Sequence, residues 1–85
     1  MFEVTYKKQA EKMLLKLPDH LKKRIRQKMA IIAQDPFGQH NNVTKLKDRP
    51  GYRLRVGDWR VIYRIIDDQV CILVVKIAPR GSVYR

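Results

Sequence analysis

The sequence is poor in cysteine, in acidic residues and in long hydrophobic runs. Its single cysteine, Cys71, excludes an internal disulfide and is typical of a reducing cytoplasm. The longest purely apolar stretch, around residues 71–75, is far shorter than the roughly 20 residues that span a membrane. The N-terminal residues also lack the apolar core of a signal peptide. We therefore expect a soluble, cytoplasmic protein that does not enter a membrane.

Acidic residues are outnumbered by basic ones. The chain has 19 Lys and Arg against 8 Asp and Glu, a formal net charge of +11. This excess favours a polyanionic partner, such as nucleic acid, an anionic membrane surface or an acidic protein.

Residues that commonly carry metal or acid–base chemistry are few. Cysteine and histidine do not have the spacing of metal ligands, so we expect no metal, and we expect no small-molecule cofactor. Asp67 and Asp68 adjoin each other between two strand-like segments, which indicates a turn more than a paired-carboxylate site. His20 and His40 are more typical of surface residues than of catalytic ones.

The first part of the chain predicts a helical hairpin after one strand. Residues 2–6 alternate weakly and can form a strand, and residues 7–17 carry apolar side chains on one helical stripe. Pro18 ends this helix, and Asp19 is expected to cap a second helix at residues 20–35.

The second part predicts four strands joined by short turns. They are expected at residues 43–48, 52–56, 59–66 and 69–77. The expected element order is βααββββ, an α+β fold in which the helical hairpin packs on a small antiparallel sheet. We expect residues 1–85 to form a single domain.

Residues 52–64, YRLRVGDWRVIYR, place four arginines in an otherwise strong strand pattern. A two-residue turn at residues 57–58 sets the register of a hairpin, with Arg55 directly opposite Arg60. Strand alternation then separates a core face from an opposite face. The core face is expected to carry Tyr52, Leu54, Val56, Trp59, Val61 and Tyr63, and the opposite face Arg53, Arg55, Arg60, Ile62 and Arg64.

The arginine face is expected to destabilise the hairpin unless a counter-charge is bound there. Like charges opposite each other weaken a hairpin by on the order of 0.2–1 kcal/mol per pair. The exposed face of a sheet is expected to be polar, and arginine stems cover apolar surface well, but neither explains charge of one sign. Guanidinium groups match phosphate oxygens, so the face is predicted to bind phosphate.

Other basic residues extend the predicted nucleic-acid surface. Lys45 and Lys47 follow the same spacing of two before the hairpin, and Lys76 and Arg80 come after it. Tyr84 has a ring that could stack on a base, although an apolar-face position is equally consistent with the sequence. The second helix carries further cations on its outer face, and we expect RNA contacts there from Lys22, Lys23 and Arg26.

The segment KLKDRPGYRLRVGDWRVIYRI, followed by ILVVKIAPRGSVYR, resembles the RelE/ParE superfamily of toxins from type II toxin–antitoxin systems. With the helical hairpin before it, the resemblance covers essentially the whole chain and implies a RelE-like microbial RNase fold. RelE-type members cleave mRNA in the ribosomal A site, whereas ParE-type members poison DNA gyrase. Both types are implied to bind a cognate antitoxin.

Carried onto this chain, the RelE-type active surface corresponds to Arg53, Arg55, Arg60, Arg80 and Tyr84. The sequence departs from the best-known RelE pattern in having arginines at 53 and 55 in place of lysines. It also has Pro79 where many relatives have His or Lys. Both departures concern proton transfer.

Metal-independent RNA cleavage by the neighbouring 2′-OH requires a base, charge stabilisation on the phosphate and an acid. Arginine clamps phosphate well but is a poor base at neutral pH. Tyr84 would act as the base only if neighbouring cations favoured its phenolate. We therefore expect the charge cluster and in-line geometry to carry most of the rate.

The leading interpretation is a ribosome-dependent mRNA endoribonuclease, an mRNA interferase that inhibits translation. Its expected partners are the ribosome, mRNA and a cognate acidic antitoxin. A largely disordered antitoxin segment would fold on the basic surface, covering the arginine face or displacing the tail. The alternatives are a ParE-like gyrase inhibitor, which has no need of the arginine set with Tyr84, and a non-catalytic RNA- or antitoxin-binding module.

Overall fold

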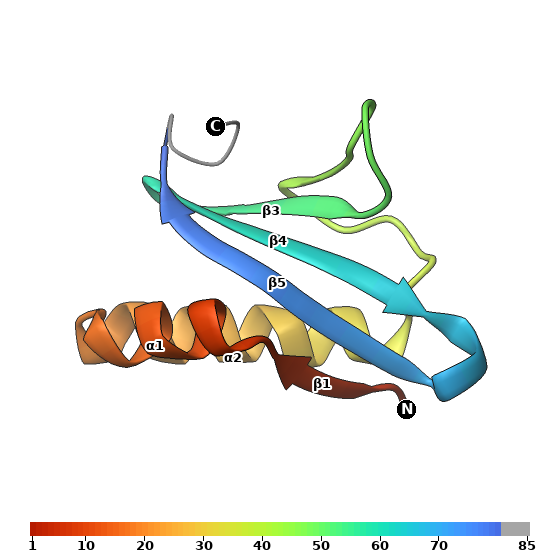
Figure 1. The fold of residues 1–85 in the computed structure, drawn as a ribbon, viewed down its shortest axis with the longest axis horizontal. Coiled ribbons are helices and arrows are strands. Elements are labelled where there is room, and N and C mark those ends of the chain that lie inside the picture. The colour runs from red at the N-terminus through yellow and green to blue at the C-terminus, as the bar shows by residue number, and fades with distance from the viewer. Residues whose placement is uncertain (81–85) are drawn as a thin grey trace.

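The structure is a computed structural model that describes residues 1–80, and its element order is the predicted βααββββ. Both helices lie along one face of the sheet (Figure 1). No helix within the described residues has the length and apolar character needed to cross a membrane. The elements are β1 (Glu3–Tyr6), α1 (Lys8–Lys16), α2 (Asp19–Gln34), β2 (Val43–Lys45), β3 (Tyr52–Val56), β4 (Trp59–Ile66), the 3-10 turn η1 (Asp67–Gln69) and β5 (Cys71–Pro79).

The sheet is mixed, and in this respect the expected antiparallel sheet is wrong. Its strand order is β1-β5-β4-β3-β2. The strands β2 to β5 form the predicted antiparallel meander. The first strand, however, pairs parallel to β5, with Glu3 opposite Cys71. Alternation along a segment predicts a strand but carries no information about the direction of a partner distant in sequence.

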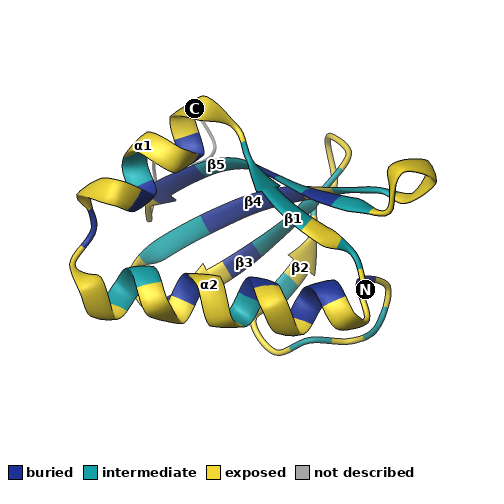
Figure 2. Cartoon of the chain, turned by 90° about the horizontal axis from the view of Figure 1, so that it is seen from below, coloured by how far each residue is buried: buried dark blue, intermediate teal, exposed yellow. Residues whose placement is uncertain are grey.

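The hydrophobic core lies between the helices and the sheet. Figure 2 shows the buried residues along the inner sides of α1 and α2 and along the central strands. Each fully buried aliphatic side chain stabilises the fold by about 1.5–3 kcal/mol relative to an exposed one. The core residues are Ala10, Leu14, Leu17, Ile25, Met29, Ile32, Ala33, Leu54, Val56, Val61, Tyr63, Ile72, Val74 and Ile77.

The start of α2 differs from the prediction in its cap. The helix begins at Asp19, Pro18 occupies the preceding position, and no side chain caps the helix. The Asp19 carboxylate instead lies 3.3 Å from Lys22 Nζ; because the carboxylate is fully exposed, the pair contributes little to stability. An acidic residue in the first turn still complements the helix dipole, so Asp19 suits its position without capping.

A second, smaller apolar cluster lies on the sheet face away from the helices. Ile62, expected on the polar face, is only 6% exposed and packs with Ala78, Leu46 and Val75. Lys45 pairs with Tyr52 and so belongs to the helix side of the sheet, and the next residue, Leu46, therefore lies on the side of Ile62. The strand β2 itself ends at residue 45, before the predicted 48, and the register of β4 against β5 shifts between residues 62 and 63.

Gly51 and Gly57 both adopt positive φ, at 119° and 58°, but their surroundings differ. A Cβ on Gly51 would lie 2.9 Å from the Tyr63 carbonyl oxygen, whereas nothing lies within 4 Å of a Cβ on Gly57. We expect Gly57→Ala to lower the free energy of unfolding by about 1 kcal/mol, through backbone strain alone. Gly51→Ala should lower it by about 3 kcal/mol, because a backbone clash adds to the strain. Urea unfolding of both variants measures this, and equal losses would contradict it.

Candidate functional site

The β3–β4 hairpin has the predicted register. Arg55 lies opposite Arg60, Leu54 opposite Val61, and the ends of the ladder are the predicted pairs. Leu54 is 1% exposed and Val61 is fully buried, so this side of the hairpin faces the helices. Because side chains alternate along a strand, Arg53, Arg55 and Arg60 lie on the opposite, helix-free face.

These three arginines line one shallow cavity of ≈ 250 Å³, together with Asn42 and Thr44. Thr44 pairs with Arg53 across β2 and β3. Asn42 has a left-handed backbone, with φ at 65°, and its carbonyl oxygen accepts a hydrogen bond of 2.9 Å from the Arg55 backbone N–H. The cavity therefore joins guanidinium groups to a neutral polar rim.

Arg60 is the electrostatic centre of this arginine cluster. Its pKa is lowered by desolvation, and then by the positive charges of Arg53, Arg55 and Arg80, while Asp58 acts in the opposite direction. One guanidinium nitrogen, Nη1, donates to the Trp59 carbonyl oxygen at 3.3 Å. After desolvation, the nearby positive charges are the next contribution that lowers the pKa, so an anion placed among these cations would reduce their repulsion.

Arg80 reaches the cluster because the end of β5 is tied to the hairpin turn. Its backbone N–H donates to the Asp58 carbonyl oxygen at 2.8 Å. In the ladder between β4 and β5, Arg60 pairs with Ala78, two residues before Arg80. Four of the five residues predicted to be catalytic therefore lie close enough to interact, and Tyr84 lies outside the described residues.

Lys45 and Lys47 do not extend the arginine face in the predicted way. Lys45 pairs with Tyr52, so its side chain belongs to the helix side of the sheet. The predicted spacing of two does not apply, because β2 ends at Lys45, and the face on which Lys45 lies depends on the register with β3, which the sequence does not reveal. Lys47 lies in the loop after β2 and lines a separate hollow that also includes Arg49 and Arg53.

The other predicted RNA-binding residues occupy different surfaces. Arg64 shares the helix-free face by alternation but does not line the arginine cavity. The α2 cations lie at the start of the helix, on the opposite layer of the molecule, around a concave surface of ≈ 510 Å³. That surface is lined by Asp19, His20, Lys22, Lys23 and Arg26.

Asn42 and Thr44 are site residues that the sequence did not indicate. Only the register of β2 with β3 could have placed them at the cavity, and no local sequence pattern contains that register. Neither histidine lines the arginine cavity: His20 is on α2, and His40 bonds the Asp35 carbonyl oxygen at 2.7 Å. Residues 1–80 also contain no group of three or more Cys, His, Asp or Glu placed to hold a metal ion. The described cavity is thus lined by three guanidinium groups and the neutral side chains of Asn42 and Thr44.

Comparison with known proteins now identifies the family. A family model described as ParE toxin of type II toxin–antitoxin system, parDE, matches residues 4–84. The chain belongs to the RelE/ParE superfamily of type II toxins. A search of curated proteins gives no match.

Solved structures of RelE toxins share the fold of this RelE/ParE toxin. The RelE chain in the archaeal RelE–RelB complex from Pyrococcus horikoshii OT3 is 31% identical, with a TM-score of 0.80, covering 96% of this chain and 98% of that one. The intact E. coli RelBE toxin–antitoxin complex gives 20% identity, a TM-score of 0.80 and coverage of 96% and 99%. The isolated E. coli RelE toxin is 22% identical, with a TM-score of 0.80, covering 99% of this chain and 92% of that one. The predicted superfamily and the α+β fold are thus confirmed.

The arginine cluster predicts an unusual stability effect. Replacing Arg60 by Gln removes the positive charge opposite Arg55, so we expect Arg60→Gln to raise the free energy of unfolding of the isolated toxin by about 0.5–1 kcal/mol at low salt. The gain should shrink as salt screens the repulsion. Urea unfolding at low and high NaCl concentrations measures it.

Arg24→Gln is the matched control, since it makes the same change in net charge on the exposed surface of α2. If Arg60→Gln is no more stabilising than Arg24→Gln at low salt, repulsion within the cluster is not significant.

Proposed function

We propose that this toxin is a RelE-type endoribonuclease that cleaves mRNA on the translating ribosome and so inhibits translation. The supporting observation is the gathering of Arg53, Arg55 and Arg60 around one cavity, with the charge of Arg80 acting on Arg60. Guanidinium groups bind phosphate through paired hydrogen bonds and remain protonated at neutral pH. Like charges that oppose each other across a hairpin are expected at a functional site, where an anionic ligand would stabilise them.

In the proposed reaction, a ribose 2′-oxygen attacks the adjacent phosphorus and the 5′-oxygen of the next nucleotide leaves. The 2′-OH gives up its proton, the leaving oxygen takes one up, and a cyclic phosphate remains. The arginine cluster stabilises the negative charge that builds up on the phosphate oxygens. Because the cavity-lining residues among 1–80 offer no base of neutral pKa, the ribosome or water assists proton transfer and in-line geometry supplies much of the rate.

The remaining basic residues have proposed roles in holding RNA. Arg64, Lys45 and Lys47 border the mRNA path around the sheet edge. Lys22, Lys23 and Arg26 contact ribosomal RNA from the other layer of the molecule. Two basic surfaces on opposite sides allow the toxin to touch mRNA and ribosome together, which accounts for an expected weak activity on free RNA. A cognate acidic antitoxin neutralises the toxin in this scheme.

The first test maps mRNA 5′ ends in cells that express the toxin. We expect cuts confined to translated reading frames, reduced at least ~100-fold by Arg60→Ala, because that variant loses the central phosphate clamp. Arg24→Ala is the matched control and should cut like the unaltered toxin. Equal cutting by Arg60→Ala and Arg24→Ala would contradict the assigned role of the cluster.

Inhibition of DNA gyrase is the second candidate, favoured by the ParE description of the matching family. The same cells distinguish it: growth arrest with DNA breaks and no mRNA cuts would assign gyrase as the target. Neither arrest nor cuts would leave an RNA- or antitoxin-binding module.

The contribution of Tyr84 is tested by removing only its hydroxyl. In a reconstituted translation system we expect Tyr84→Phe to retain cleavage within about 10-fold of the unaltered toxin, because charge stabilisation dominates the rate. Arg60→Ala in the same system should lose far more. If the two losses are equal, the tyrosine hydroxyl carries an essential proton transfer.

A further inference from the structure

The strand β5 is longer than the strand that covers its outer edge. Its pairing with β1 ends at Val74, whose carbonyl oxygen accepts the Lys7 backbone N–H at 2.9 Å. Beyond that point β5 continues well past the end of β1 (Figure 1). Among residues 1–80, no strand lies beside the outer edge of this last part of β5, which leads directly to Arg80 of the arginine cluster.

A side chain of α1 takes the place of the missing strand. The Gln9 carboxamide nitrogen, Nε2, donates to the Ile77 carbonyl oxygen, and its oxygen, Oε1, accepts the Ile77 backbone N–H, each at 3.4 Å. A carboxamide that bonds both backbone groups of one residue supplies what a neighbouring strand would supply. Gln9 therefore holds the outer edge of β5 at Ile77.

An irregularity in β5 explains why Ile77 is the residue that α1 holds. The register against β4 shifts between residues 62 and 63, which leaves Val75 as an extra residue on β5. The extra residue reverses the alternation along the strand, so Ile77 turns its N–H away from β4 and toward α1. The next outward position is Pro79, which has no N–H to donate. The Ile77 N–H is thus the last outward donor of the strand.

The opposite edge of the same segment is tied to the hairpin turn. The Arg80 backbone N–H donates to the Asp58 carbonyl oxygen at 2.8 Å. Ile77 lies three residues before Arg80, so the end of β5 is held by Gln9 on one edge and by the turn on the other. The charge of Arg80 acts on Arg60, and the position of the strand end therefore sets how these two guanidinium groups share the cluster.

We propose that Gln9 is a positioning residue for Arg80 in the arginine cluster. By fixing Ile77, it sets the place from which the Arg80 guanidinium reaches the phosphate of the RNA substrate. Gln9 is itself exposed and is not among the residues that line the arginine cavity, so it acts through β5. The inference rests on the proposed function for the role of Arg80 in the reaction, but the fixing of the strand end is measurable without any reaction.

The first test measures the strand end by amide hydrogen exchange, followed by NMR. Gln9→Ala removes both bonds and, because the side chain is exposed, opens no cavity in the core. We expect exchange at Ile77 and Arg80 to become at least ~5-fold faster, and exchange at Leu54 to stay within ~2-fold. Gln27→Ala, the same change at an exposed glutamine of α2, is the matched control. If Arg80 exchanges equally in the two variants, the proposal is wrong.

A second variant separates the hydrogen bonds from the bulk of the side chain. Gln9→Met keeps the length of the side chain and removes both the donor and the acceptor. Exchange at Arg80 should be as fast in Gln9→Met as in Gln9→Ala. Exchange as slow as in the unaltered toxin would mean that packing of α1, and not the bonds from the carboxamide, holds the strand end.

A double-mutant cycle in a reconstituted translation system tests the link to Arg80. We expect Gln9→Ala to slow mRNA cleavage by about 5-fold in the unaltered toxin but by less than ~2-fold in the Arg80→Ala background. A residue needed only for folding would slow both by the same factor, and equal losses would contradict the proposal. If the unaltered toxin does not cleave mRNA, the proposed function is wrong, and hydrogen exchange still decides whether Gln9 fixes the strand end.

Discussion

The hairpin register of β3 and β4 is the constraint on which the fold and the candidate site both depend. One side of the hairpin buries Leu54, Val56 and Val61, and the other side carries the arginines. A slip of one residue would turn every side chain to the opposite face and place arginines in the core. Burial of each apolar residue contributes about 1.5–3 kcal/mol, against on the order of 0.2–1 kcal/mol lost where Arg55 opposes Arg60. The core therefore dictates the register, and the arginine repulsion is tolerated.

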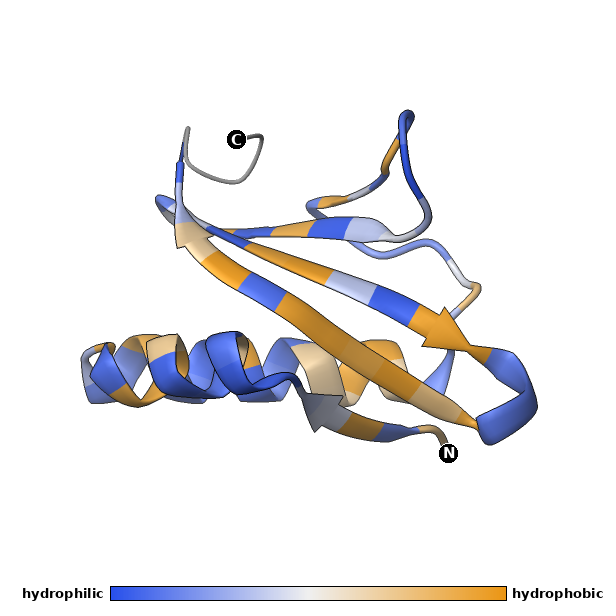
Figure 3. Cartoon of the chain, in the orientation of Figure 1, coloured by the Kyte–Doolittle hydropathy of each residue, from blue (hydrophilic) through white to orange (hydrophobic). Residues whose placement is uncertain are grey.

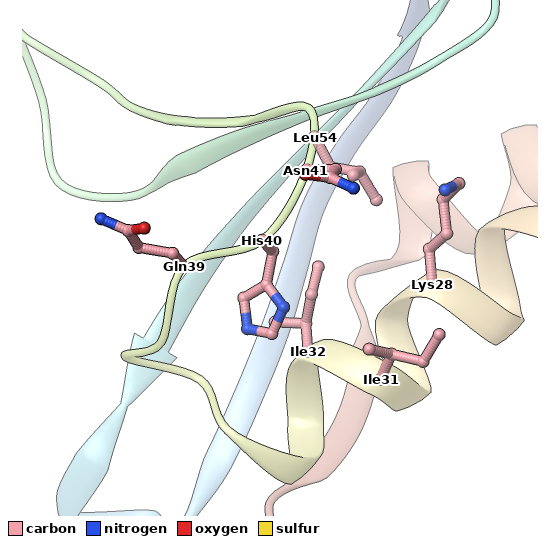
Figure 4. A pocket seen from close by; sticks show the side chains of 7 residues that line it. All are labelled: Lys28, Ile31, Ile32, Gln39, His40, Asn41 and Leu54. Atoms are coloured by element: carbon pink, nitrogen blue, oxygen red, sulfur yellow. The ribbon is translucent and has the colours of Figure 1, made fainter.

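This arrangement gives the small protein two chemically different sides that share one core. The helix-free side concentrates guanidinium groups around a shallow cavity. The helix side carries the basic start of α2 and a hollow whose floor includes the buried side chains of Ile32 and Leu54 (Figure 4). Figure 3 shows that β5, next to the centre of the sheet, is the most continuously hydrophobic strand. Its alternate residues Ile72 and Val74 are buried under the helices, whereas Leu73 and Val75 on the other face are half-buried.

The segment before β2 is where these two sides meet. Asn41 lines a hollow between α2 and residues 39–41, and Asn42, the next residue, lines the arginine cavity. The left-handed backbone of Asn42 and its hydrogen bond to Arg55 place the chain at the edge of β3.

Local patterns in the sequence determined the elements, the hairpin register and the arginine face, because helical and strand periodicities and a two-residue turn act over a few residues. They also carried the resemblance to the RelE/ParE superfamily. Only the tertiary structure decided the parallel pairing of β1 with β5, the burial of Ile62 under Leu46, and the side of the sheet on which Lys45 lies. It also brought Asn42 and Thr44 to the arginine cavity and formed the hollow between α2 and residues 39–41. Each of these depends on which distant segments pair and in what register, and that is settled by burial of the whole core, which no local pattern contains.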